Sequence, residues 1–165
     1  MFRSLLVAVL IAVPLSAQGL NLDFAALAAK ATSKTELNLD GAVLEEARKA
    51  LPEGGKFAGV TGVSIHTFKY AKAGQYPTDG LDALRKQVAA DSRWSKLLSS
   101  HEEKESADIY VQFQDGRLAG LLLISVEPTE VAVIQATGSV ELAQMQEVVK
   151  SAIQFDLASL AAPGK

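Results

Sequence analysis

The sequence predicts an α+β domain: an antiparallel or mixed β-sheet with helices packed on one face, forming a two-layer sandwich. Two observations lead to this fold class. Helical and strand-like periodicities alternate in the first half of the chain, and four successive strand-like segments joined by short turns follow in the second. Short turns favour antiparallel pairing, because a parallel connection needs about a dozen residues or more. The length of 165 residues fits one such domain.

The N-terminus has the order of residues that is typical of a secretory signal peptide. One cation, Arg3, precedes an apolar run from Leu5 to Leu15, and small residues follow the run. The run is well short of the roughly 20 residues that a membrane-spanning helix needs. Cleavage could follow Ala17 or Gly19. We therefore expect the leader to be removed and the mature chain to retain no stable membrane anchor.

The expected organisation is a signal peptide at residues 1–19, a single α+β domain at 20–157 and a flexible tail at 158–165. The chain contains no cysteine, which excludes disulfides, thiolate metal sites and a cysteine-linked lipid anchor. With 16 basic and 19 acidic side chains the net charge is −3, and a nucleic-acid-binding domain would instead show a basic excess.

The mature chain is expected to open with a short helix within residues 20–34, where apolar residues recur at helical spacing. Residues 35–40 alternate leucine with polar residues and predict a short strand. An amphipathic helix is expected over 42–51. Asp40 can cap this helix at its start, and Pro52 ends it.

Residues 60–71 are rich in β-branched and aromatic side chains and predict a strand. A helix is then expected over 80–89, capped by Thr78 or Asp79, because leucines and a valine recur on one of its faces. A short strand is expected around residues 97–98.

The most apolar part of the sheet is expected in residues 107–127. Residues 107–114 alternate apolar and polar side chains, and Asp115-Gly116 predicts a two-residue hairpin turn. The returning strand, 117–127, is apolar on both faces, which is typical of a central strand. Leu122 and Ile124 should therefore be almost fully buried.

One more strand and one more helix complete the expected domain. The strand covers residues 131–138, after the corner at Pro128. Ser139 is expected to cap a long helix over 140–155, whose apolar stripe comprises Leu142, Met145, Val149 and Ile153.

Four residues are expected to form a binding site: His66, Tyr110, Gln112 and Gln135. The last three fall on the polar side of their strands, and an exposed sheet face of polar and aromatic side chains can act as a binding platform. His66 is a candidate contact on another strand. No sequence neighbour completes a triad or a metal set around it, so we expect no catalytic residue, metal or cofactor. His101, in HEEKE, lacks the second histidine of HExxH, which predicts a solvated turn.

The run LLLISVEPTEVAVIQATGSVEL places two strands around a Glu127-Pro128 corner, followed by a turn of small residues. Other distinctive stretches are TELNLDGAVLEEARKAL, GVSIHTFKYAKAGQY, LDALRKQ, RWSKLLSS and ADIYVQF. With these stretches, nearly all of residues 20–150 resemble a bacterial family known as domain of unknown function 4252, and the first run is the most specific part of the resemblance. The resemblance implies an exported envelope or periplasmic protein and implies no activity. Some relatives are lipoproteins, an anchor that a chain without cysteine cannot carry.

The expected function is that of an exported cell-envelope protein, periplasmic or secreted, which acts as a non-catalytic binding or interaction module. Its partner would be a protein or a small molecule of the envelope, and not a nucleic acid. The alternative is a small hydrolase-like periplasmic enzyme that uses His66 and a nearby carboxylate. An enzyme would need a concave pocket in which His66 meets a second titratable group within hydrogen-bond reach.

Overall fold

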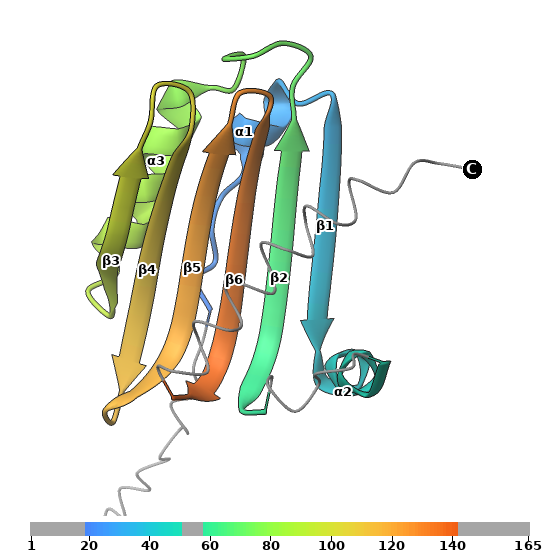
Figure 1. Cartoon of the computed structure of the whole chain (residues 1–165), viewed down its shortest axis with the longest axis vertical. Helices are drawn as coiled ribbons and strands as arrows, with labels where there is room; N and C mark the ends of the chain where they lie inside the picture. Colours follow the sequence, from blue (N-terminus) through green and yellow to red (C-terminus); the bar gives the residue numbers. More distant parts are fainter. Residues whose placement is uncertain (1–18, 51–57, 142–165) are drawn as a thin grey trace, which may run out of the picture.

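The computed structural model describes residues 19–50 and 58–141. They form a six-stranded antiparallel open sheet and three helices (Figure 1). The elements in chain order are α1 (Ala25–Ala29), β1 (Ser33–Asp40), α2 (Gly41–Ala50), β2 (Val60–Lys69), α3 (Thr78–Ala90), β3 (Trp94–His101), β4 (Ser106–Gln114), β5 (Arg117–Glu127) and β6 (Glu130–Val140).

The strands lie in the order β1-β2-β6-β5-β4-β3 (Figure 1). The last four strands of the chain are therefore neighbours in sequence order, as their short turns predicted. The expectation that 117–127 is a central strand is confirmed, because β5 lies between β4 and β6. The hairpin expected at Asp115-Gly116 is also confirmed. Both residues have positive φ, 52° and 75°, as the favoured two-residue hairpin turn requires.

One face of the sheet holds the larger hydrophobic cluster, which side chains of α1 and α3 join; Figure 1 shows both helices behind the strands. Leu122 and Ile124 lie at its centre with 0% of their surface exposed, as expected. The Tyr70 hydroxyl donates to the Leu27 carbonyl oxygen at 2.9 Å and so joins the chain after β2 to α1. The buried members are Leu27, Phe68, Tyr70, Leu81, Leu84, Val88, Trp94, Tyr110, Leu122, Ile124, Val126, Val131 and Val133.

A second buried cluster includes the α2 residue Leu44. Its other buried members are Val60, Val111, Leu118, Leu121 and Val140. In β5, Leu121 belongs to this cluster and the adjacent Leu122 to the larger one, so the two clusters lie on opposite faces. The expectation that all helices share one face is therefore not met. The physical reason is that β5 is apolar on both faces, so apolar side chains are needed on both sides.

The end of β6 differs from the sequence expectation. Ser139 was expected to cap a helix, but it continues the strand, which ends at Val140. Its backbone N–H donates to the carbonyl oxygen of Gly59 at 2.8 Å, a bond that no sequence neighbour provides. Residues 142–155 of the expected helix, the expected tail at 158–165 and residues 1–18 of the expected leader lie outside the described residues. Within the described part of the chain, no helix has the length and apolar character to cross a membrane.

Candidate functional site

His66 lies on β2, on the sheet face that carries the larger cluster. In the strand register it is opposite Glu36 of β1 on one side and Val133 of β6 on the other. Its ring stacks on Phe24, which precedes α1, with 4.3 Å between the ring centroids and 29° between the planes. Phe24 also contacts Phe68, two residues along β2, at 5.7 Å. The histidine is therefore held by aromatic packing against the N-terminal segment.

His66 lines a groove of about 680 Å³ between the N-terminal segment and the strands β1 and β2. The two walls differ in chemistry. The N-terminal segment and α1 contribute a mainly apolar wall, made by Leu20, Asn21, Leu22, Phe24, Ala25 and Ala28. The strands contribute a mainly polar wall, made by Lys34, Thr35, Glu36, Asn38, Ser64, His66 and Phe68. The side-chain nitrogen of Asn38 donates to Oε1 of Glu36 at 2.8 Å within the strand wall.

Gln135 lines a second hollow, of about 380 Å³, which shares Asn38 and Ser64 with the groove. The two hollows therefore adjoin along β1 and β2, and the structure brings Gln135 close to the His66 groove. Ser64 lies directly between them, since it is opposite Gln135 in the strand register and two residues from His66. Gln135 is half-buried, in contrast to the exposed position that the sequence suggested.

The expectation that Tyr110 and Gln112 lie on an exposed face is wrong. They are only 4% and 5% exposed. Both share a sheet face with Leu122, the face that holds the larger cluster. The alternation predicted for β4 is correct. Both faces of this strand are buried, however, so the side chains on its polar face also point into the protein. Oε1 of Gln112 and the indole Nε1 of Trp94, directly opposite on β3, have no hydrogen-bond partner among the described residues.

A buried carboxylate that sequence reasoning missed lies on the same face of β4. Asp108 is 0% exposed, and its Oδ2 accepts from Nε of Arg85 on α3 at 2.8 Å. Its Oδ1 accepts from the Ser99 hydroxyl at 2.5 Å, and the ammonium nitrogen of Lys96 lies 3.4 Å away. Burial alone would raise the pKa of Asp108, but the hydrogen bonds from Ser99 and Arg85 and the two positive charges lower it overall.

The sequence pattern could have identified Asp108, because it alternates with Tyr110 and Gln112 and so lies on the same face of the predicted strand. Its partners come from α3 and β3, which only the fold brings together. Ser99 is also 3.4 Å from Nδ1 of His101. This order differs from that of a hydrolase triad, in which the histidine lies between the serine and the carboxylate. Here the hydroxyl lies between the other two, and it donates to a carboxylate whose lowered pKa makes it a weak base.

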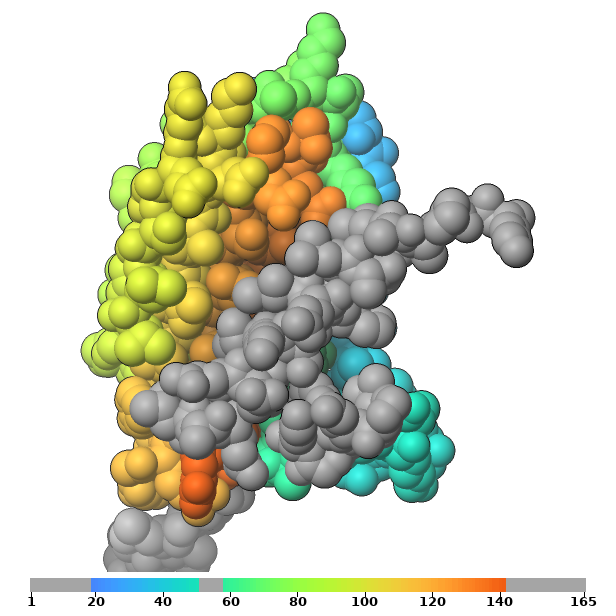
Figure 2. Space-filling view, viewed as in Figure 1, coloured from blue at the N-terminus to red at the C-terminus, as the bar shows by residue number. Residues whose placement is uncertain are grey.

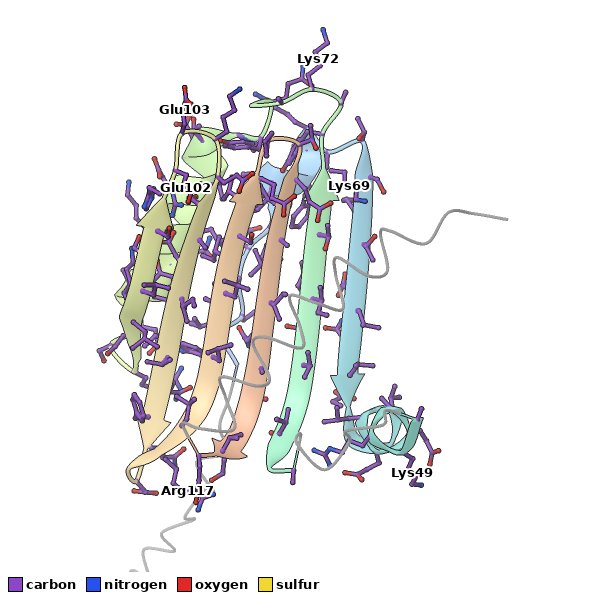
Figure 3. The ribbon with its side chains drawn as sticks, in the orientation of Figure 1. Lys49, Lys69, Lys72, Glu102, Glu103 and Arg117 are labelled. Carbon is purple, nitrogen blue, oxygen red and sulfur yellow. The ribbon has the colours of Figure 1, made fainter. Side chains whose placement is uncertain are left out.

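The turn between β3 and β4 is exposed, as expected for the HEEKE segment. Figure 3 shows Glu102 and Glu103 at the tip of this hairpin, at the opposite end of the sheet from Lys49 on α2. Figure 2 shows the same hairpin as the yellow flank of the molecule. Among residues 19–50 and 58–141, no group of three or more histidine, aspartate and glutamate side chains is arranged to hold a metal ion.

Comparisons with known proteins agree with the sequence resemblance. No curated protein and no solved structure shows a significant match to this chain. The family described as Domain of unknown function (DUF4252) matches residues 30–148. This match covers most of the chain, from the residues before β1 to beyond the end of β6. The chain therefore belongs to the DUF4252 family.

Proposed function

We propose that this protein is an exported cell-envelope protein, and that it binds a small molecule or a segment of another protein in the groove beside His66. The observation that carries the proposal is the groove itself. Its volume of about 680 Å³ falls within the roughly 300–1,000 Å³ that is usual for ligand sites. Binding sites of this kind combine apolar walls with a few placed polar groups, and this groove has one wall of each sort.

The groove favours a ligand with an apolar body and a polar edge. Phe24 offers aromatic surface on the wall made by the N-terminal segment. On the other side, Glu36 offers hydrogen-bond acceptors and Lys34 offers donors, so both kinds of polar group find a partner. Gln135 would contact a ligand that extends past Ser64 into the adjoining hollow.

The alternative function is a small hydrolase that uses His66 with a carboxylate. Glu36 is the nearest candidate, because it is the cross-strand neighbour of His66 on the same face. The observed contacts support binding better than catalysis. The His66 ring stacks on Phe24, and the Glu36 carboxylate accepts from Asn38 rather than orienting the imidazole.

The test compares the mature wild-type protein with His66→Ala, and uses His101→Ala as a matched control in β3, at the other edge of the sheet. A thermal-shift screen of envelope metabolites and a quantitative pull-down from envelope extract should both identify ligands. We expect His66→Ala to weaken binding of those ligands about tenfold or more, and His101→Ala to leave it unchanged. Equal binding by all three proteins would rule out the groove as the site.

The same variants separate the enzyme from the binding module. A hydrolase would lose about two orders of magnitude or more of turnover in His66→Ala at unchanged stability. Glu36→Gln would then cause a comparable loss, whereas a binding module shows no turnover that depends on either residue.

Export has its own test, in the native host. We expect intact-mass measurement to give a mature chain that begins at Gln18 or Leu20, because the apolar run is too short to remain as a membrane span. Full-length protein that retains Met1 in the membrane fraction would contradict export by cleavage.

A further inference from the structure

The two edges of the sheet differ in regularity. β1 forms one edge, and all eight of its residues pair with β2 in one unbroken register, from Ser33 opposite Lys69 to Asp40 opposite Gly62. β3 forms the other edge, and its register with β4 shifts between Lys96 and Leu98. Such irregularities blunt an edge against further pairing. β1 contains neither a shift nor a proline.

An edge strand of this length presents a row of backbone N–H and C=O groups on its outer side. All of its side chains are exposed except the half-buried Leu39. Charged side chains on an edge usually oppose pairing. On β1, however, the signs of the charges differ along the strand: Lys34 lies near the start, Glu36 near the middle and Asp40 at the end. Their order decides which partner strand fits.

We propose that β1 pairs in antiparallel fashion with β1 of a second copy of this chain, about a two-fold axis at Leu37. In this register Lys34 lies opposite Asp40 of the second copy, which brings opposite charges together. Glu36 lies opposite Asn38, its hydrogen-bond partner within the strand. Leu37 meets Leu37 of the second copy on the other face, once, at the axis. The two-fold symmetry repeats every contact away from the axis, so the Lys34–Asp40 pair occurs twice.

The two neighbouring registers are worse. A shift of two residues in one direction centres the axis on Glu36 and places two Glu36 carboxylates opposite each other, and a shift in the other direction centres it on Asn38 and places Glu36 opposite Asp40. Like charges directly opposite are destabilising, so the charges on β1 favour the register centred on Leu37. α2 begins immediately after Asp40 and lies at the end of β1 in Figure 1, so it limits the paired stretch on that side.

The proposed axis is perpendicular to the sheet, so each face continues into the same face of the second copy. Glu36 and His66 are opposite each other and share a face, so the wall that β1 gives to the groove faces the same side in both copies. Leu37 alternates with Glu36 and points to the other face. A substitution at Leu37 therefore tests the pairing without changing the groove of the proposed function.

The absence of cysteine makes a direct cross-linking test possible. We expect Leu37→Cys to form a disulfide-linked dimer rapidly under mild oxidation, because directly opposed residues in antiparallel strands have Cα atoms about 4.5–5.5 Å apart, within disulfide range. Leu98→Cys is the matched control, as an exposed leucine on the other edge strand. Equal rates for the two variants would overturn the proposal, and faster cross-linking of Glu36→Cys would overturn the register.

Charge exchange tests the same register without a covalent bond. Sedimentation velocity over a range of concentrations should show a dimer of the mature wild-type protein. Lys34→Glu alone and Asp40→Lys alone should each weaken it about tenfold or more, since each places like charges opposite twice. The double variant should restore dimerisation. A monomer at every concentration, or a double variant no better than the single ones, would overturn the pairing, even if the groove binds its ligand.

Discussion

Arg85 of α3 and Asp108 of β4 form a charge-assisted hydrogen bond in which Nε of the guanidinium lies 2.8 Å from Oδ2 of the carboxylate. The carboxylate is fully buried, whereas the arginine side chain keeps 25% of its surface exposed. The bond therefore joins the helix to the second strand of the β3–β4 hairpin through a charge that water cannot reach. Ser99 on β3 and Lys96 add two further contacts to the same carboxylate.

Replacing Asp108 should be strongly destabilising. In Asp108→Ala the hydrogen bonds from Arg85 and Ser99 are lost, and breaking a buried pair by removing one partner costs about 3–5 kcal/mol. Urea denaturation at pH 7 would measure the change in the free energy of unfolding. Asp82→Ala is the control, because Asp82 is an exposed partner of Arg85 at 3.6 Å and should matter by less than about 1 kcal/mol. Similar losses for the two variants would contradict the role of burial.

The contribution of Asp108 should depend on pH in one direction. Its folded-state pKa is below the ordinary value of 3.8, so the stabilisation is fully present above that value and is lost as the pH falls through the lower, folded-state pKa. We expect the difference in unfolding free energy between wild type and Asp108→Asn to be constant from about pH 5 to pH 7 and to shrink below about pH 4. A difference that grows on acidification would show that the pKa is raised instead.

Leu122 should be one of the most costly positions to truncate. It is 0% exposed in the central strand β5, and Leu122→Ala should lower the free energy of unfolding by about 2–5 kcal/mol through lost burial and a residual cavity. Leu97→Ala provides the comparison, because Leu97 is 60% exposed and should change stability by less than about 0.5 kcal/mol. A change below about 0.5 kcal/mol at Leu122 would mean that β5 is not a core strand.

Gly120 is expected to be required because of the indole that faces it. A β carbon at this position would lie 2.7 Å from Cη2 of Trp94, so Gly120→Ala forces a shift in the core and should cost about 1–3 kcal/mol. Trp94→Phe removes Cη2, the atom that the new β carbon would contact too closely. In that background the cost of Gly120→Ala should fall, and denaturant titrations of the four proteins of the cycle measure the coupling. Additive losses would show that the indole is not the obstacle.

Much of the fold could be predicted from local sequence patterns. The periodicities predicted the described strands and helices in their correct order, because hydrogen bonding within a helix or hairpin depends on neighbours in the chain. Most of the predicted bounds differ from the observed ones by a few residues. The 107–127 region is the clearest case. Its alternation, its Asp115-Gly116 turn and its apolar return strand are local signals, and each was met.

The sites were harder to predict, because they depend on which strands become neighbours. The sequence identified His66 as a candidate, but the aromatic contact from Phe24 and the opposite position of Glu36 arise only when the N-terminal segment and β1 meet β2. Tyr110 and Gln112 were predicted to be exposed because, in a sheet with one solvent-exposed face, the polar residues of an alternating strand face the solvent. This strand is buried on both faces, so the rule failed there and also concealed Asp108.

The sequence by itself determined the strand and helix elements, the central place of residues 117–127 and the family, because these follow from periodicity, turn residues and a continuous match along the chain. Only the tertiary structure decided the burial of Asp108, the division of the helices between two hydrophobic clusters and the unbroken edge at β1. Each of these depends on contacts between residues far apart in the chain. Side-chain alternation shows only which residues of a strand share a face. What packs against each face is decided when the strands assemble into the sheet.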